Sequence, residues 1–424
     1  GVLPAHQVTR GSLASSLRAG SRGTRTQPST LRLRRTIVIA EMAMAVTLLA
    51  GAGLLLRSFS RLMHVDTGFD PSRVMTYNAV MPGQRYATPE AQRTFVSSLE
   101  AKLRAIPGVT SAAIASDLPL DGRNFVISYA IKGQPPIPPT QQPSARIESI
   151  TSEFFTTMGM RLLKGRAFRP DEREGAAQVA VVNEAFVRKS LANDEPLGKY
   201  IELGWTDEKV RHGGTIVGVV ADVKQTGLGS EVDPTVYLPY AQAPRSGLSI
   251  AVRTGKDGIS VASALRSTLK EIDGDLPMYN LRPMGEVVAT SVATERFYMI
   301  LLTTFAGVAL VLSAVGLYGV IAFAVSQRTT ELGVRVALGA STGNISRMII
   351  GEGLVMSVVG VAVGLGASAY LTKILASLLF DIKPLDPATF FGVATALVLV
   401  AISASYLPAR RAARADPLVA MRGD

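Results

Sequence analysis

Residues able to catalyse a reaction or hold a metal are sparse in this chain of 424 residues. It has no cysteine, and its three histidines, His6, His64 and His212, lie far apart in sequence. Thiolate chemistry and disulfides are therefore excluded, and a metal site built from histidines is disfavoured. The candidate catalytic carboxylates Asp117, Asp121 and Asp222 are interpreted as loop and turn residues. Because residues 58–296, the expected outer segment, also lack a Gly-x-Ser-x-Gly elbow and a His-Glu-x-x-His motif, we expect no catalytic, cofactor or metal residues.

Two carboxylates, Glu41 and Glu352, interrupt otherwise apolar runs. A lone carboxylate is costly in hydrocarbon, so such residues face a polar interior, pair with arginine or carry protons. Glu41 lies six residues from Arg35, and Glu352 lies five residues from Arg347. Each is thus about one or two helical turns from the same membrane surface. We favour snorkelling or a salt bridge over a proton relay for both residues.

Apolar residues make up 47% of the chain, and their excess is concentrated in four blocks that are each long enough to cross a bilayer. The predicted transmembrane spans are 36–57, 297–325, 344–373 and 387–408. All four blocks are rich in glycine and alanine, as in Gly360-Val-Ala-Val-Gly364, which favours close helix packing. The first block is interpreted as a retained anchor rather than a cleaved signal peptide, since no small-residue cleavage site follows it.

Charge predicts the orientation of these spans. Residues 1–35 carry seven arginines and no acidic residue, and the segments 326–343 and 409–424 are also net basic. The positive-inside rule places these segments, and both termini, in the cytoplasm. The large segment 58–296 and the short loop 374–386 then lie outside. The basic N-terminal segment is explained by topology and anionic lipid, so no nucleic acid partner is expected.

The outer segment contains a degenerate repeat. Apolar residues with spacings of 4, 4 and 3 recur 166 residues apart, as Phe95, Leu99, Leu103 and Ile106 and then as Val261, Leu265, Leu269 and Ile272. Each set forms one face of a helix. Strand-like runs flank both helices, and Gly108 and Gly274 are predicted to end them at matching positions. We therefore expect two β-α-β units, at 58–140 and 246–287, that join in one α+β layer; the alternative is a chance likeness between two amphipathic helices.

An insertion, residues 141–245, separates the two units. Its pattern predicts strands and short helices, and Pro135-Pro-Ile-Pro-Pro139 is interpreted as an extended linker that leads into it. The predicted elements are a strand at 145–150, a helix at 152–158, a strand and helix within 179–191, and strands at 199–203, 215–223 and 236–238.

Several stretches resemble the MacB/FtsX-type permeases of ABC transporters. They are Arg328–Ala340 (RTTELGVRVALGA), Pro408–Arg422 (PARRAARADPLVAMR), Val179–Glu184 (VAVVNE), Pro196–Lys199 (PLGK) and Val217–Val223 (VGVVADV). With the arrangement of one span, an outer domain and three further spans, the resemblance extends over residues 30–422. It implies that the split layer is a Porter-like subdomain and that the insertion is a Sabre-like subdomain.

The resemblance also implies a function in the inner membrane of a bacterium. Such permeases transmit the cycle of a cytoplasmic ABC ATPase to the outer domain, for export with a periplasmic partner. The alternative is a non-transporting FtsX-like regulator of an extracytoplasmic enzyme. The sequence has no Gly-x-x-x-x-Gly-Lys-Ser/Thr motif, so ATP and Mg²⁺ are expected on a partner ATPase and no cofactor on this chain.

The segment 326–343 is the expected ATPase-coupling loop. A helix from Gln327 to Leu338, ended by a left-handed Gly339, would place one set of residues on a shared face. That set is Gln327, Glu331, Val334, Arg335 and Leu338, and Arg328 completes the expected ATPase-coupling interface. An ordinary charged membrane loop is the alternative, and the family resemblance favours docking.

The first residues resemble the last. Pro4–Arg18 aligns without gaps on Pro408–Arg422, with both arginine positions matched. We therefore expect residues 1–18 to be the tail of a preceding permease half; a basic segment with accidental matches is the alternative. One half has four spans, so a second half is expected as a partner, in a homodimer or a fused repeat.

Overall fold

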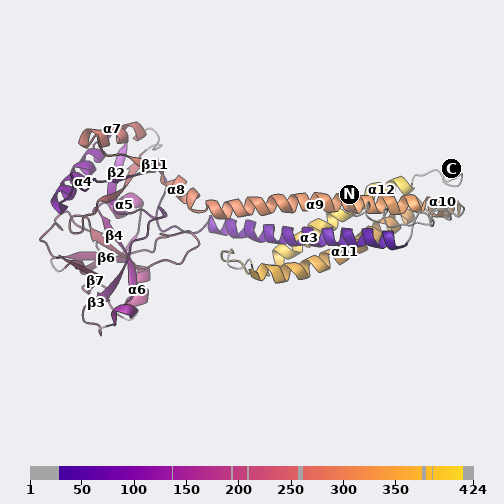
Figure 1. The fold of residues 1–424 in the computed structure, drawn as a ribbon, viewed down its shortest axis with the longest axis horizontal. Coiled ribbons are helices and arrows are strands. Elements are labelled where there is room, and N and C mark those ends of the chain that lie inside the picture. The colour runs from indigo at the N-terminus through magenta and orange to yellow at the C-terminus, as the bar shows by residue number, and fades with distance from the viewer. Residues whose placement is uncertain are drawn as a thin grey trace, which may run out of the picture. The chain divides into compact units, whose positions relative to one another are not determined.

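The computed structural model describes residues 28–135, 137–191, 194–207, 210–255, 261–374, 379–383 and 385–413. The expected repeat tail at 1–18 lies outside these residues. The chain divides into two compact units, a membrane unit made by residues 1–59 and 297–424, and an outer unit made by residues 60–296. Figure 1 shows the ribbon of both.

Within the described residues, four long helices have the length and apolar composition needed to cross a membrane. They are α3 (Pro28–Leu62), α9 (Ala293–Gln327), α11 (Thr342–Ile374) and α12 (Pro387–Ala413). Each predicted apolar block lies within one of these helices. The four-span membrane architecture expected from the sequence is therefore present.

Glycines on α11 allow the neighbouring helices to approach closely. A Cβ added at Gly360 would lie 2.7 Å from Cβ of Met42 on α3, and one at Gly364 would lie 2.5 Å from Cβ of Val46. Gly353 is equally crowded, by the Ser405 hydroxyl on α12 and by the Ile321 side chain on α9. Any larger side chain at these positions would push the helices apart, so the small residues set the packing of the bundle.

The outer unit contains the predicted pair of β-α-β units. The first is β1 (Val74–Val80), α4 (Pro89–Arg104) and β2 (Val109–Ala115); the second is β10 (Gly247–Thr254), α7 (Ala262–Ile272) and β11 (Tyr279–Pro283). Their strands alternate in one layer in the order β11-β1-β10-β2, with antiparallel neighbours. The repeated apolar residues of α4 and α7 share one core cluster, so the repeat is structural rather than accidental.

The two repeat helices differ at their ends. Thr88 caps α4, since its hydroxyl accepts a hydrogen bond from the Ala91 amide, and Gly108 has a left-handed φ of 90°. Gly274 is not in the left-handed region, and α7 ends where Asp273 is extended at φ −151°. The prediction that the two glycines end their helices is therefore wrong: α4 already stops at its C-cap Ala105, three residues before Gly108, and α7 stops where Asp273 is extended.

The insertion closes into a ring of six strands. Its strands are β3 (Val126–Ile131), β4 (Ser144–Ile150), β6 (Val179–Asn183), β7 (Tyr200–Asp207), β8 (Val210–Val220) and β9 (Thr235–Pro239). They pair in the order β4-β3-β7-β8-β6-β9, and β9 pairs back onto β4 in parallel. The short strand β5 (Leu162–Gly165) pairs with β8, and the helices α5 (Phe154–Met158) and α6 (Glu184–Ser190) complete the insertion. Closure removes exposed strand edges and encloses a second apolar core.

Strand β3 corrects the sequence prediction of where the insertion begins. It was not predicted, yet it pairs with β4 and β7 as a full member of the ring. The proline-rich segment 135–139 connects β3 to β4, and therefore lies within the insertion rather than before it. The linker interpretation is wrong because the two strands on either side of the prolines are antiparallel neighbours.

The shared core of the split layer predicts equal importance for the two repeat helices. Leu99 on α4 and Leu265 on α7 occupy equivalent positions, and both are fully buried. Leu99→Ala and Leu265→Ala should each lower the free energy of unfolding by about 2–5 kcal/mol, through lost contacts and the cavity left behind. Proteolysis of the full chain across a urea series measures this. Leu163→Ala, on an exposed side chain, is the control, and a loss as large there would contradict the assignment.

Candidate functional site

The predicted coupling segment forms a short helix at one end of the membrane unit. Helix α10 covers Thr329–Ala337, after α9 ends at Gln327 and the chain turns at Arg328 with φ −115° and ψ 18°. The single helix predicted from Gln327 is therefore wrong at its start, because Gln327 completes α9. The predicted end is correct: Gly339 has φ 92°, and the amides of Gly339 and Ala340 donate to the carbonyls of Val336 and Arg335. These two bonds form a Schellman motif, which fixes where the helix stops.

Helix α10 has two faces. Leu332 and Gly333 are buried and Val336 is half-buried, facing a hollow of about 210 Å³ that α9 and α12 also line. Opposite them, four of the predicted docking residues are exposed: Glu331, Val334, Arg335 and Leu338. Leu338 is 83% exposed, which is unusual for a leucine next to a packed helix. The helix thus presents apolar and charged groups together on a fixed support.

An ion pair orients that exposed face. Glu331 and Arg335 are 2.7 Å apart at a spacing of four residues, and Arg335 also lies 3.0 Å from the sulfur of Met348 on α11. Exposed pairs of this kind contribute little to stability. Arg335 thus has contacts both on its own helix and on α11.

Glu352, on α11, is paired as the sequence predicted. Its carboxylate accepts a hydrogen bond from Arg328 at 2.8 Å and lies 3.6 Å from Arg35 of α3. One carboxylate therefore connects three parts of the chain: the turn before α10, the helix α11 and the helix α3. The arrangement ties the start of α10 to the bundle.

Glu41 has a different environment. Its carboxylate faces α9, where a Cβ added at Gly316 would lie 2.4 Å from the Glu41 Oε2 atom. That oxygen is buried, and among the described residues no group donates a hydrogen bond to it. The Ser313 hydroxyl donates to the Glu41 backbone carbonyl at 3.2 Å instead. The arginine pair expected from the sequence is therefore not found for Glu41 in the described part of the chain.

The outer unit contains a buried ionic cluster that the sequence prediction missed. Arg146 on β4 is fully buried, and its Nη1 atom lies 3.3 Å from Asp117 and 3.4 Å from Glu148. Arg123 adds a second cation 3.7 Å from Asp117. Burial, reinforced by the charge of Glu148, raises the pKa of Asp117 from 3.8 to about 7. Burial also raises the pKa of Glu148.

This ionic cluster lies where the split layer meets the six-stranded ring. Strands β2 and β4 pair there through Ala115 and Ile150, and the Thr151 amide donates beside them to the Ile114 carbonyl at 2.9 Å. Ser116 follows Ala115, and its hydroxyl donates to Glu148 at 2.9 Å. Buried charges require partners, so the cluster favours one arrangement of the two subdomains.

The three aspartates considered from sequence all have structural partners. Asp117 belongs to the buried cluster, so the interpretation as a simple turn residue is wrong for it. Asp121 accepts a hydrogen bond from Asn78 at 2.7 Å, and Asp222 accepts one from the Ala185 amide of α6 at 2.7 Å. Over the described ranges, no group of three or more metal-binding side chains converges. The hydrogen bonds of these aspartates link segments that are distant in sequence.

Comparison with known proteins places both units. Residues 303–417 match the family model for the FtsX-like permease C-terminal region, and residues 36–268 match the model for the MacB-like periplasmic core domain. The chain is 27% identical over 293 residues to the macrolide export ATP-binding/permease protein MacB of Burkholderia thailandensis, covering 66% of this chain and 43% of that protein. MacB 2 of Aeromonas hydrophila is 28% identical over 293 residues, with the same coverage. The chain thus spans less than half the length of these curated relatives.

Solved structures align with about half of the chain. The periplasmic region of MacB from Actinobacillus actinomycetemcomitans matches with a TM-score of 0.36 and 18% identity, covering 54% of this chain and 97% of that one. The extracellular domain of YknZ, a transporter from Gram-positive bacteria, matches with a TM-score of 0.33 and 13% identity, covering 49% and 100%.

The raised pKa of Asp117 predicts the pH dependence of the outer unit. Above pH 3.8 the folded state keeps a proton on Asp117 that the unfolded state releases. Protonation of Asp117 therefore stabilises the folded state, fully below pH 3.8, and this contribution is lost as the pH rises through about 7. Thermal unfolding should therefore occur at a lower temperature at pH 8 than at pH 5.5. Asp117→Asn, which cannot ionise, should flatten this difference; an unchanged slope would show that Asp117 is not the responsible group.

Proposed function

Because this chain belongs to the family of MacB/FtsX-type permeases, we propose that it is the permease part of an ABC transporter driven by a separate cytoplasmic ATPase. In this proposal, α10 binds the ATPase, and its movement is transmitted through the membrane helices to the outer unit to drive export. The observation that carries the proposal is the exposed face of α10, with Leu338 83% exposed on a helix fixed at both ends.

The contacts at the base of α10 support transmission of force. Glu352 ties Arg328, at the start of α10, to α11 and to Arg35 on α3. A displacement of α10 would therefore pull on Glu352 through Arg328, and so act on α11 and α3. The chain runs from α3 into the outer unit and returns to the membrane through α9, so these two helices are the covalent route for the movement.

The ATPase and the second permease half are the proposed partners. The relatives named above combine ATP-binding and permease functions, and this chain covers 43% of their length. The matched part corresponds to the permease models at 36–268 and 303–417. A second half with its own four spans, in a homodimer or a fused repeat, would supply a second docking helix for the ATPase. A periplasmic partner at the outer unit completes the proposed assembly.

We further propose that the chain lies in the inner membrane of a bacterium, with both termini and α10 in the cytoplasm. Arginines support this orientation, since Arg34, Arg35, Arg328, Arg335 and Arg411 all lie at the end of the membrane unit that carries α10. The outer unit gives no opposing signal, because long segments cross the membrane largely regardless of their charge.

Single cysteines can test the orientation, because the chain has none of its own. Lys132→Cys, at an exposed position of the outer unit, should react with a membrane-impermeant maleimide added to spheroplasts. Ser341→Cys, exposed just after α10, should react only after the membrane is broken. The reverse labelling pattern would contradict the proposed topology.

A substitution at Leu338 tests docking of the ATPase. Leu338→Asp replaces an exposed apolar anchor by a charge, and should weaken co-purification of the cognate ABC ATPase on the order of tenfold, since central apolar anchors dominate such interfaces. Permease-stimulated ATP turnover should fall with it. The substitution removes few contacts within the chain, so folding should be unaffected.

Leu162→Asp is the matched control for this experiment, because Leu162 is also exposed but belongs to the outer unit. It should leave both ATPase binding and turnover unchanged. If Leu338→Asp behaved like this control, α10 would not be the docking helix.

A further inference from the structure

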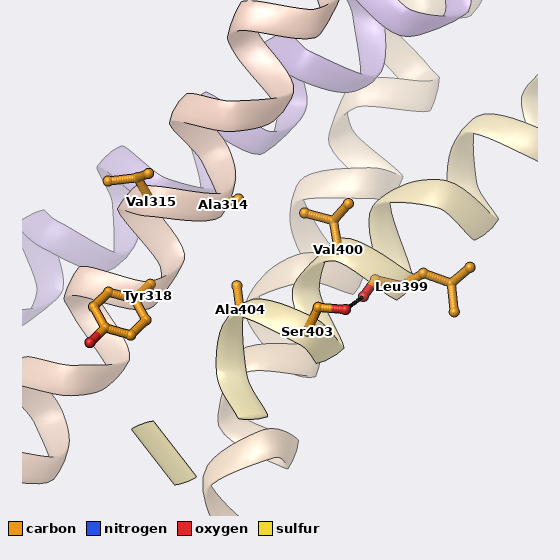
Figure 2. Close-up of a pocket in the computed structure, with 7 residues that line it drawn as sticks. All are labelled: Ala314, Val315, Tyr318, Leu399, Val400, Ser403 and Ala404. Atoms are coloured by element: carbon orange, nitrogen blue, oxygen red, sulfur yellow. Dashed lines mark hydrogen bonds between the residues drawn. The ribbon is translucent and has the colours of Figure 1, made fainter. Parts of the chain in front are cut away.

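A groove separates α9 from α12 on the surface of the membrane unit. Its volume is about 380 Å³, and it is lined by Ala314, Val315, Tyr318, Leu399, Val400, Ser403 and Ala404. In Figure 2, the small side chains of Ala314 and Ala404 lie between the two helices, together with Val400. Small residues on both walls leave the groove open.

The groove wall is almost entirely apolar. The polar group of Ser403 is already satisfied, since its hydroxyl donates to the Leu399 carbonyl of the same helix at 2.8 Å, as Figure 2 shows. No wall residue carries a charge. A hydrocarbon chain could therefore fill the groove without leaving a polar group of the wall unpaired.

One end of the groove is positively charged. The Arg411 guanidinium, on α12, donates from Nη1 to the hydroxyl of Tyr318, at a distance of 2.9 Å. Arginine has five N–H donors, and within the described ranges Arg411 makes this single hydrogen bond and no ion pair. The side chain is exposed, so its other donors are accessible to a ligand at the end of the groove.

We propose that this groove binds one acyl chain of an anionic phospholipid, whose phosphate is held by Arg411 next to the Tyr318 hydroxyl. The groove lies on membrane helices, so hydrocarbon is the solvent around it. In the part of the chain that the structure describes, Arg411 has no carboxylate partner, while Glu352 pairs with Arg35 and Arg328, and Glu331 pairs with Arg335. Apolar walls with an available arginine at one end match a lipid that has an anionic head group.

The same arginine extends the site toward α10. Arg411 also lines the hollow beneath that helix, together with Leu332, Gly333 and Val336 of its inner face. A phosphate bound to Arg411 would therefore lie beside the packed side of the proposed docking helix. Lipid composition would then influence how α10 is held, although the lipid site itself does not depend on ATPase docking.

Photo-crosslinking tests the site directly. The full chain is reconstituted in phosphatidylethanolamine vesicles that contain a minor fraction of phosphatidylglycerol with a diazirine on its acyl chain. After irradiation, the labelled peptides should come from α9 around Ala314–Tyr318 and from α12 around Leu399–Ala404. A matched phosphatidylethanolamine probe should label the groove more weakly.

Two variants, each with a control, separate the effect of the arginine charge from the effect of the space in the groove. Arg411→Gln should reduce labelling by the anionic probe about fivefold, the effect of one basic side chain near a membrane surface. Arg410→Gln, the adjacent exposed arginine, should have a smaller effect because it does not contact Tyr318. Ala404→Leu should reduce labelling by both probes, whereas Ala362→Leu, on the exposed side of α11, should reduce neither.

Several results would overturn the proposal. Equal losses from Arg411→Gln and Arg410→Gln would indicate only general attraction to the surface. Unchanged labelling in both Arg411→Gln and Ala404→Leu would show that the groove holds no lipid. A photoreactive residue introduced at Leu399 that joins to a second copy of the chain, rather than to lipid, would show that a protein covers the groove.

Discussion

The membrane unit is governed by one constraint: hydrocarbon offers no hydrogen bonds to the backbone. The chain meets it with four helices, whose amides and carbonyls pair within each helix. Because lipid is as apolar as the side chains, helix association must come from close packing rather than from exclusion of water. The glycines of α11 allow this close packing. Gly360 and Gly364 contact α3, and Gly353 contacts both α9 and α12.

The same constraint concentrates charge at the helix ends. Glu352 is tolerable because two arginines from other elements reach it. Glu41 lacks such a partner among the described residues, and lies against Gly316 of the neighbouring helix instead. The two carboxylates look alike in sequence but differ physically: one anchors the base of α10, while the other is an uncompensated polar group within the bundle.

Outside the membrane, a different interaction fixes the arrangement. The split layer and the six-stranded ring meet through the short pairing of β2 with β4 and the backbone bonds beside it, and the buried cluster of Asp117, Arg146 and Glu148 adds charge pairing at the same junction. Removing one partner would leave an uncompensated buried charge, which is far more costly than losing an exposed pair. The junction is thus defined by electrostatics as well as by packing.

The sequence by itself determined the elements whose signal is local. Four apolar runs predicted the spans, and the spacing of Phe95, Leu99 and Leu103 predicted α4, because burial of a helix face imposes a period along the chain. Gly339 predicted the end of α10, because only a residue without Cβ adopts a left-handed φ at no cost.

The tertiary structure decided what depends on partners distant in sequence. Strand β3 is rich in residues that favour strands, but its place in the ring depends on its pairing with β4 and β7, which also makes the supposed proline linker a connection within the ring. Likewise, Asp117 became part of an ionic cluster only because folding brings Arg146 and Glu148 to it. A periodic pattern records burial along one element, whereas strand closure and charge pairing depend on distances between elements, which no local pattern contains.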